Sequence, residues 1–280
     1  MIRRFAAGTA VATGLALSLT GCLGAAKDKA GETGTQIQLS AAQVLGKAAE
    51  KTGQTDTYKA DVTIDGTMSQ GSMKMHMVMQ TRLRPTLAMA INIDSANVGG
   101  QSMPGGGGME MRLVSDAMYM KIPGLAAQNN GKPWARMSLS ALGGNYDQLL
   151  QQAQQQNPAE QTKLLTGSKD VREVGTENVG GVQTKHYSGT VSLNEALAKL
   201  DAQSRQKMEK AYQQLGTQKI GFDVWVSDDS LPRKIVSKVQ TGMGAVNTTM
   251  LFSDFGKPVE VSAPPASEVG EFKMPSLGGN

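Results

Sequence analysis

Residues 73–79 read Met-Lys-Met-His-Met-Val-Met. A methionine occupies every second position, so on an extended strand all the methionines point to one face and the intervening residues to the other. On a helix the same residues would be spread around the circumference, because the helical period is 3.6. The stretch therefore predicts a β-strand with one apolar face.

The same alternation extends to both sides of this stretch, from Tyr58 to Ile122. Turn or bend signals separate the apolar runs at Gln70-Gly71, Arg84-Pro85 and Asp116-Ala117. We therefore expect an antiparallel meander of about five strands. The alternating apolar positions are Ala60, Val62, Ile64, Met73, Met75, Met77, Met79, Leu87, Met89, Ile91, Ile93, Met109, Met111, Leu113, Met118, Met120 and Ile122.

Helices are expected before and after this meander. Ser40 followed by Gln43 forms a capping-box pattern and predicts a short helix that ends near Gly53. Ser192 followed by Glu195 repeats the pattern and predicts a long helix. The helices expected after the meander cover residues 145–156, 157–167 and 192–215.

More strands are expected in the second half of the chain, at 171–191 with a Gly180-Gly181 turn, and around Phe222–Val226, Ile235–Val239 and Met250–Phe252. These elements predict an α+β fold with one large antiparallel sheet whose apolar face the helices cover. The glycine-rich segment Gly99–Gly108 lacks a Gly-Lys-Ser/Thr ending and a following helix, so it is interpreted as a loop and not as a phosphate site.

The N-terminus has the organisation of a secretion signal. Arg3 and Arg4 precede an apolar stretch over residues 10–19, which is shorter than the roughly 20 residues that a membrane span needs. The tetrapeptide Leu19-Thr20-Gly21-Cys22 resembles the lipobox of bacterial lipoproteins, in which the cysteine is lipidated and becomes the first mature residue. We therefore expect a signal peptide over 1–21, a lipidated flexible tether over 22–39, one domain over 40–265 and a flexible tail over 266–280. The resemblance places the protein at the outer face of the cell membrane, anchored by lipid on Cys22.

Charge and composition narrow the class of ligand. Without residues 1–21 the chain keeps 259 residues (280 − 21) and 26 basic residues (28 − 2) against 24 acidic ones, a net charge of +2. No arginine-rich face or basic run with interleaved aromatic residues is present, so nucleic-acid binding is not expected. The chain has 17 methionines but only 4% aromatic residues. Methionine both fills irregular cores and lines surfaces that accept variable apolar shapes, so the pattern by itself allows a dry core or a cavity for an apolar guest.

Three motifs in the second half resemble the actinobacterial LppX/LprG lipoprotein family. They are Gly180-Gly181-Val182 with Thr184-Lys185-His186-Tyr187, then Val224-Trp225-Val226 with Leu231-Pro232-Arg233-Lys234, and Phe252-Ser253-Asp254-Phe255-Gly256-Lys257-Pro258-Val259 continued through Val261 and Ala263-Pro264-Pro265. The resemblance covers residues 40 to about 265, most of the mature chain.

This resemblance implies a curved half-barrel, similar to the carrier LolA, with helices in its mouth. It also implies that the protein is not an enzyme, needs no cofactor, and binds an acylated lipid or glycolipid in an internal cavity to carry it within the envelope. An envelope transporter or another membrane protein is the candidate protein partner. The expected cavity lining is Val62, Ile64, Met73, Met75, Met77, Met79, Leu87, Met89, Ile91, Met109, Met111, Leu113, Met118, Met120, Phe222 and Val224.

Two alternatives remain open at this stage. Met73, Met75 and Met77 could bind Cu(I), because thioether sulfur is a soft ligand, although His76 should then point to the opposite face. The same half-barrel could also belong to an envelope sensor that passes a signal to a protein partner. Catalysis is not expected, since the two histidines fall on separate strands and Asp228-Asp229 is typical of a turn.

Overall fold

The computed structural model describes residues 39–68, 71–102, 107–139, 157–198, 205–206, 209, 219–242 and 244–271. Leu39–Asn280 forms one compact unit, distinct from Met1–Gln38. The expected signal peptide, Cys22 and the tether up to residue 38 lie outside the described residues, as do the expected helix over 145–156 and most of residues 199–218.

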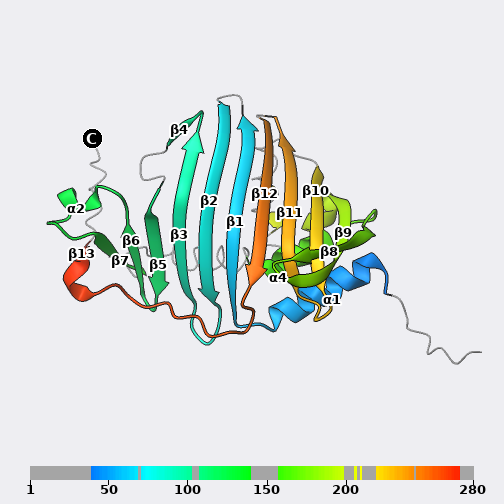
Figure 1. The fold of residues 1–280 in the computed structure, drawn as a ribbon, viewed down its shortest axis with the longest axis horizontal. Helices are drawn as coiled ribbons and strands as arrows, with labels where there is room; N and C mark the ends of the chain where they lie inside the picture. Colours follow the sequence, from blue (N-terminus) through cyan, green and yellow to red (C-terminus); the bar gives the residue numbers. More distant parts are fainter. Residues whose placement is uncertain are drawn as a thin grey trace, which may run out of the picture. The chain divides into compact units, whose positions relative to one another are not determined.

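One sheet contains all the strands in the described part of the chain, and their order is β13-β7-β6-β5-β3-β2-β1-β12-β11-β10-β9-β8, with β4 beside β3. β8 and β13 are its two edges, so the sheet is open. Figure 1 shows these strands side by side across the molecule. The strands are β1 (Thr57–Met68), β2 (Gly71–Arg82), β3 (Ala88–Val98), β4 (Gln101–Ser102), β5 (Met109–Val114), β6 (Ala117–Lys121), β7 (Trp134–Ser138), β8 (Arg172–Val179), β9 (Val182–Ser192), β10 (Lys219–Ser227), β11 (Pro232–Thr241), β12 (Gly244–Ser253) and β13 (Val269–Glu271).

All strand pairs are antiparallel except β13 with β7. The predicted α+β class with one large, mainly antiparallel sheet is therefore confirmed. The expected meander is present as β1 to β6, with the glycine-rich segment contributing the short β4. The register shifts by one residue between His76 and Met77, which leaves Asp94 on β3 as an unpaired bulge residue.

Side chains cap the starts of the helices that begin after Ser40, Asn157 and Ser192. Ser40 accepts a hydrogen bond from the Gln43 backbone nitrogen and Gln43 accepts one from the Ser40 nitrogen, and Ser192 and Glu195 form the same box. Both predicted capping boxes are therefore confirmed. The helices are α1 (Ala41–Gly53), α2 (Leu125–Gln128), α4 (Pro158–Leu165), α5 (Leu193–Leu197) and the 3-10 helix η2 (Ala266–Glu268).

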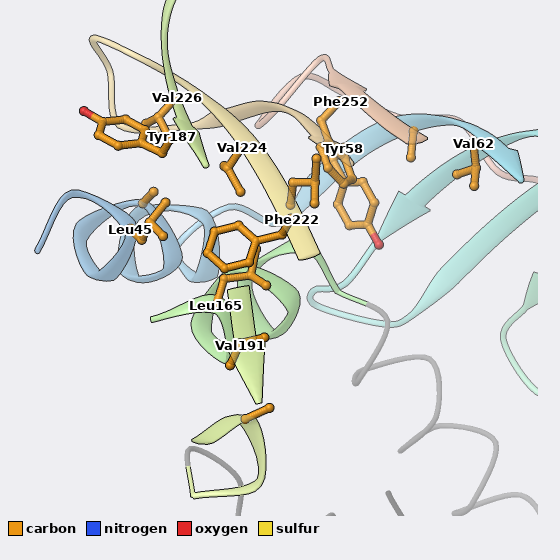
Figure 2. Close-up of a cluster of buried hydrophobic side chains, with 14 residues drawn as sticks. Leu45, Tyr58, Val62, Leu165, Tyr187, Val191, Phe222, Val224, Val226 and Phe252 are labelled. Carbon is orange, nitrogen blue, oxygen red and sulfur yellow. The ribbon is translucent and has the colours of Figure 1, made fainter. Parts of the chain in front are cut away.

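The main hydrophobic core lies between α1, α4 and α5 and the part of the sheet formed by β1 and β9 to β12. Figure 2 shows Leu45 of α1 and Leu165 of α4 facing Phe222 and Val224 of β10. Tyr58 and Phe252 pack edge to face at the β1–β12 side of this core, with ring centroids 6.3 Å apart. Helices thus cover one face of the sheet, as the sequence predicts.

The chain after β12 returns along the ends of the central strands, as Figure 1 shows for the segment that leads to β13. Val259 and Val261 pack on Ala88 in a second, smaller core, and Val269 pairs with Trp134. The ordered sheet therefore continues past Pro265, where the sequence analysis placed the end of the domain. The reason is that β13 gains its hydrogen bonds from β7, which is more than a hundred residues away and gives no local signal.

Candidate functional site

The candidate site is the apolar face of the sheet that the helices partly cover, here called the inner face. Its alternation is aligned across neighbouring strands. Val62 on β1 lies opposite Met77 on β2 and Met250 on β12, and Met77 in turn lies opposite Ile93 on β3. Side chains of directly opposed residues share a face, so the apolar rows of separate strands join into one surface.

A second row on the inner face extends across five strands, from β1 to β6. Ala60 opposes Met79, Met79 opposes Ile91, Ile91 opposes Met111 and Met111 opposes Met120. Five strands that differ in length and in local sequence thus place apolar side chains in one row across the sheet. This alignment depends on the bulge at Asp94, because one extra residue in β3 restores the inward direction of Ile93 and Ile91.

The described residues include every residue that the sequence predicted as cavity lining. Val62, Leu113, Phe222 and Val224 are buried, and the other predicted lining residues are half-buried. Pairing puts these residues on the inner face, with the exception of Leu87, which precedes β3 and has no strand partner. Phe222 and Val224 belong to the main core beneath the helices, so they serve packing first. The half-buried members are Ile64, Met73, Met75, Met77, Met79, Leu87, Met89, Ile91, Met109, Met111, Met118 and Met120.

The inner face therefore has two parts with different chemistry. The part on β9 to β12 carries buried aromatic and branched residues that pack on the helices. The part on β2 to β7 carries mostly unbranched methionine, and none of its methionines is among the buried core residues. Methionine has three rotatable bonds and a polarisable sulfur, so a surface of this kind adapts to apolar guests of different shape.

Two hydroxyl groups at one end of the inner face were not predicted from the sequence. Tyr58 and Thr81 oppose each other on β1 and β2, and their row continues as Met89, Leu113 and Met118. Burial raises the pKa of the Tyr58 phenol above its ordinary value, and a side-chain hydrogen bond with Thr81 opposes part of that rise. The only sequence signal for Thr81 is its spacing: it lies two residues after Met79 and so continues the alternate positions of the methionines on β2.

His76 lies on the opposite, outer face, as expected. Its Nε2 is 3.2 Å from Asp61 on β1 and its Nδ1 is 3.0 Å from Asp94, the bulge residue of β3. The hydrogen bond with Asp61 is the largest influence on His76 and raises its pKa above the ordinary value, because the carboxylates favour the protonated ring. His76 therefore cannot join Met73, Met75 and Met77 in a shared metal site.

His186 also lies on the outer face, between two carboxylates. It contacts Glu177 on β8 at 3.1 Å and Asp223 on β10 at 2.9 Å, and its ring stacks on Trp225 with 4.1 Å between centroids. Lys238 holds Asp223 from the other side at 2.8 Å. These contacts are those of a cross-strand ion-pair network, which connects β8 to β11. Among the described residues, no group of three or more His, Cys, Asp or Glu side chains is arranged to hold a metal ion.

Asp228-Asp229 occupies the turn between β10 and β11, as predicted. Asp229 accepts hydrogen bonds from Ser227 and from the backbone nitrogen of Leu231, and it pairs with Arg233. Its carboxylate is therefore engaged in stabilising the turn.

Two hollows border the described residues. One of about 400 Å³ lies where Gln80, Asn92 and Arg112 of the outer face meet Ser262 of the returning C-terminal segment, and Ile91 and Met111 also border it. The other, of about 340 Å³, lies between α1 and α4 beside Gly46 and Ala159. None of the helices in the described ranges has the length and apolar character needed to cross a bilayer.

Comparison with known proteins connects this geometry to a fold. LprF from Mycobacterium bovis, known from a crystal structure, is 14% identical to this chain with a TM-score of 0.51, and the match covers 80% of this chain and 96% of LprF. The chain has the fold of LprF. LppX from Mycobacterium tuberculosis matches at 16% identity and a TM-score of 0.47, over 79% of this chain and 98% of LppX. The match to LprF confirms the expected LppX/LprG-like architecture at the level of the fold.

Sequence comparison finds relatives in Streptomyces. An uncharacterised 31.2 kDa protein of Streptomyces griseus is 34% identical over 177 residues, which are 60% of this chain and 58% of that protein. A candidate lipoprotein of Streptomyces coelicolor is 29% identical over 170 residues, or 59% of this chain and 52% of that protein. The chain thus spans little more than half the length of these curated relatives. No family model matches the sequence.

Proposed function

We propose that this chain is an exported lipoprotein, anchored through lipid on Cys22, which binds the acyl chains of a lipid or glycolipid on its inner face and carries that lipid within the cell envelope. The observation that supports this proposal most directly is the division of the inner face. A methionine-rich surface on β2 to β7 remains half-buried beside a well-packed core. The fold shared with LprF and the similarity to a candidate Streptomyces lipoprotein are consistent with it.

The energetics of such a site suit a carrier. A buried methylene group gains roughly 0.8 kcal/mol on leaving water, and it gains a similar amount in a bilayer and in an apolar protein surface. Transfer of an acyl chain from membrane to protein is therefore nearly neutral, so the chain can enter and leave without an energy source. A polar headgroup would remain toward solvent.

This proposal includes no catalytic step. Both histidines lie on the outer face within carboxylate networks, and the half-buried lining of the methionine-rich surface is thioether and aliphatic. We infer a binding role that leaves the lipid chemically unchanged.

The test is native mass spectrometry of residues 23–280, which keep the whole compact unit and lack the anchor cysteine. The protein would be purified without detergent from a bacterial host and then extracted with organic solvent. We expect a stoichiometric lipid mass that extraction removes. If the protein is empty and also remains empty after incubation with diacyl lipids, the lipid-binding proposal is wrong, and Cu(I) titration of the methionine-rich surface becomes the next measurement.

A matched pair of variants separates the inner face from the outer face. Met75 is half-buried on the inner face of β2, and its neighbour Lys74 is exposed on the outer face. We expect Met75→Glu to lose the bound lipid and Lys74→Glu to retain it, with thermal unfolding confirming that both variants fold. Met75→Gln serves as a milder inner-face change if the glutamate variant fails to fold. Equal lipid occupancy in inner-face and outer-face variants would place the lipid elsewhere.

A lipid-transfer assay distinguishes a carrier from a sensor. Donor and acceptor vesicles with a fluorescent diacyl lipid would be mixed with the same protein. A carrier accelerates transfer at substoichiometric concentration, whereas a sensor binds lipid without accelerating its exchange.

A further inference from the structure

All methionines whose side chains the structure describes lie on the inner face of the sheet, as the strand pairing shows. The same strands place other side chains on the outer face, such as Lys74 and Val78 between the methionines of β2. The eleven described methionines are Met73, Met75, Met77, Met79, Met89, Met109, Met111, Met118, Met120, Met137 and Met250. The thioether groups of the described chain are therefore concentrated on a single surface.

These methionines remain accessible to small molecules. All eleven are half-buried, and none is among the buried residues of the core. Met77, Met79 and Met250 pack against the main core, whereas the other eight are not among the residues that pack against either described core. These eight, here called the open methionines, are Met73, Met75, Met89, Met109, Met111, Met118, Met120 and Met137. A small oxidant can reach their sulfur atoms without opening the core.

The open methionines are most concentrated on β5 to β7. Met111 is directly opposed to Met120, and Met118 is directly opposed to Met137. Met118 and Met120 are separated by one residue on β6, so they also share a face. An acyl chain that lies across these strands would therefore contact thioether groups at several points.

Hydrogen peroxide oxidises a thioether in one two-electron step. The sulfur lone pair attacks one peroxide oxygen, so an S–O bond forms and the O–O bond breaks. The proton on the transferred oxygen passes to the departing hydroxide, which leaves as water. The sulfur loses two electrons to the peroxide and becomes a sulfoxide. Cys22 is the only cysteine of the chain, so residues 23–280 offer no thiol that would compete for the peroxide.

The added oxygen would meet almost no hydrogen-bond donor across the strands. Met111 lies between Ile91 and Met120, and Met120 lies between Met111 and Ala135. Among the open methionines, Met89 alone is directly opposed to a hydroxyl group, that of Thr81. A lipid chain that covered the other sulfoxides would bury a polar oxygen without a hydrogen bond, which is unfavourable.

We infer that the open methionines are a modification site for hydrogen peroxide, and that their oxidation to sulfoxide releases the bound lipid. This inference rests on the proposed function and adds regulation to the same site. Oxidation converts a flexible apolar side chain into a polar one, so it weakens contact with acyl chains. The buried aromatic and branched core on β9 to β12 contains no methionine among its described buried residues and stays folded. Reductases return the sulfoxide to the thioether, so the release is reversible.

The experiment uses residues 23–280 before and after treatment with hydrogen peroxide. Peptide mass spectrometry assigns the oxidised methionines, and titration with a fluorescent diacyl lipid measures affinity. We expect sulfoxide at the open methionines and a loss of affinity of at least about tenfold, the effect of burying polar groups without partners. Treatment with the two methionine sulfoxide reductases and dithiothreitol should restore the affinity.

A variant in which leucine replaces all eight open methionines tests their role directly. Leucine is apolar and close to methionine in volume, so the untreated variant should bind the lipid nearly as the wild type does. Its affinity should then change by less than about twofold on peroxide treatment, because the open surface has no thioether left to oxidise. Met250→Leu is the matched control, since Met250 packs against the main core, and this variant should lose affinity as the wild type does.

The outcomes separate the two levels of the argument. If the untreated wild type binds no lipid, the proposed function fails and this inference fails with it. If it binds lipid and keeps its affinity when the open methionines are oxidised, lipid binding stands and the release is wrong. The release is also wrong if the eightfold variant loses affinity as the wild type does, or if circular dichroism shows that the oxidised wild type has unfolded. Should the eightfold variant fail to fold, the reductase-treated wild type decides, because affinity that does not return rules out sulfoxide formation as the cause.

Discussion

The substitution Phe222→Ala tests whether the packed part of the inner face holds the fold together. Phe222 is 1% exposed on β10 and faces Leu165 of α4 and Leu45 of α1 (Figure 2). Its register partner on β9 is Gly189, where an added Cβ would lie only 3.0 Å from the Phe222 ring. The ring therefore fills the space above a residue without a side chain, and nothing at position 189 can occupy the void that its removal creates.

The expected cost follows from that void. Truncation of a buried phenylalanine to alanine costs about 3–5 kcal/mol, and incomplete collapse beside Gly189 favours the upper part of this range. For a domain of this size, such a loss lowers the melting temperature by about 6–20 °C. Phe222→Leu keeps most of the volume and should cost about 1–2 kcal/mol.

Urea unfolding followed by circular dichroism would measure these differences in the free energy of unfolding. Val174→Ala is the control, because Val174 is 45% exposed on the edge strand β8 and its truncation should change stability by less than about 0.5 kcal/mol. A cost for Phe222→Ala below about 1 kcal/mol, similar to that of the control, would refute the assignment of this cluster as the main core.

Two further predictions concern pH and helix capping. Asp61 raises the pKa of His76, so the stabilisation from its protonated ring is complete below about pH 6.5 and is lost as the pH rises through the raised pKa. The melting-temperature difference between wild type and His76→Gln should therefore shrink as the pH rises above about 6.5, and a constant difference would contradict the ion-pair assignment. Hydrogen bonds from Ser192 lower the pKa of Glu195 to about 2, so the stabilisation that the capping box supplies is present above Glu195's ordinary pKa and is lost as the pH falls toward about 2. Ser192→Ala should lower the free energy of unfolding by about 0.5–2 kcal/mol at neutral pH in urea unfolding, and it should flatten this acid dependence. Unchanged stability would rule out the cap.

Much of the fold could be predicted because its signals are local. Alternation over residues 73–79 gave β2 and its inner face, and the capping boxes at Ser40 and Ser192 gave the starts of α1 and α5. The prediction that His76 points away from the methionines is confirmed by its contacts with Asp61 and Asp94. Each of these features depends on residues a few positions apart, so a single sequence contains enough information to find it.

Other features depend on pairings between distant segments. The sequence of residues 269–271 does not predict a strand, because β13 forms by pairing with β7. The bulge at Asp94 could not be predicted from the sequence either, although it keeps Ile93 and Ile91 on the inner face. Phe222 and Val224, expected to line a cavity, belong to the main core, because the helices pack directly on β10.

The sequence by itself determined which residues form strands and which side of each strand is apolar, since a side-chain period of two is a property of consecutive residues. It could not determine how the strands are ordered, because order and register depend on contacts between segments up to two hundred residues apart, such as Thr57 with Lys257. The three-dimensional packing was needed to show which part of the apolar face contacts the helices and which part is lined by methionine. It also revealed that Tyr58 and Thr81 are buried opposite each other, because burial and cross-strand pairing are properties of the assembled neighbours and not of the residue.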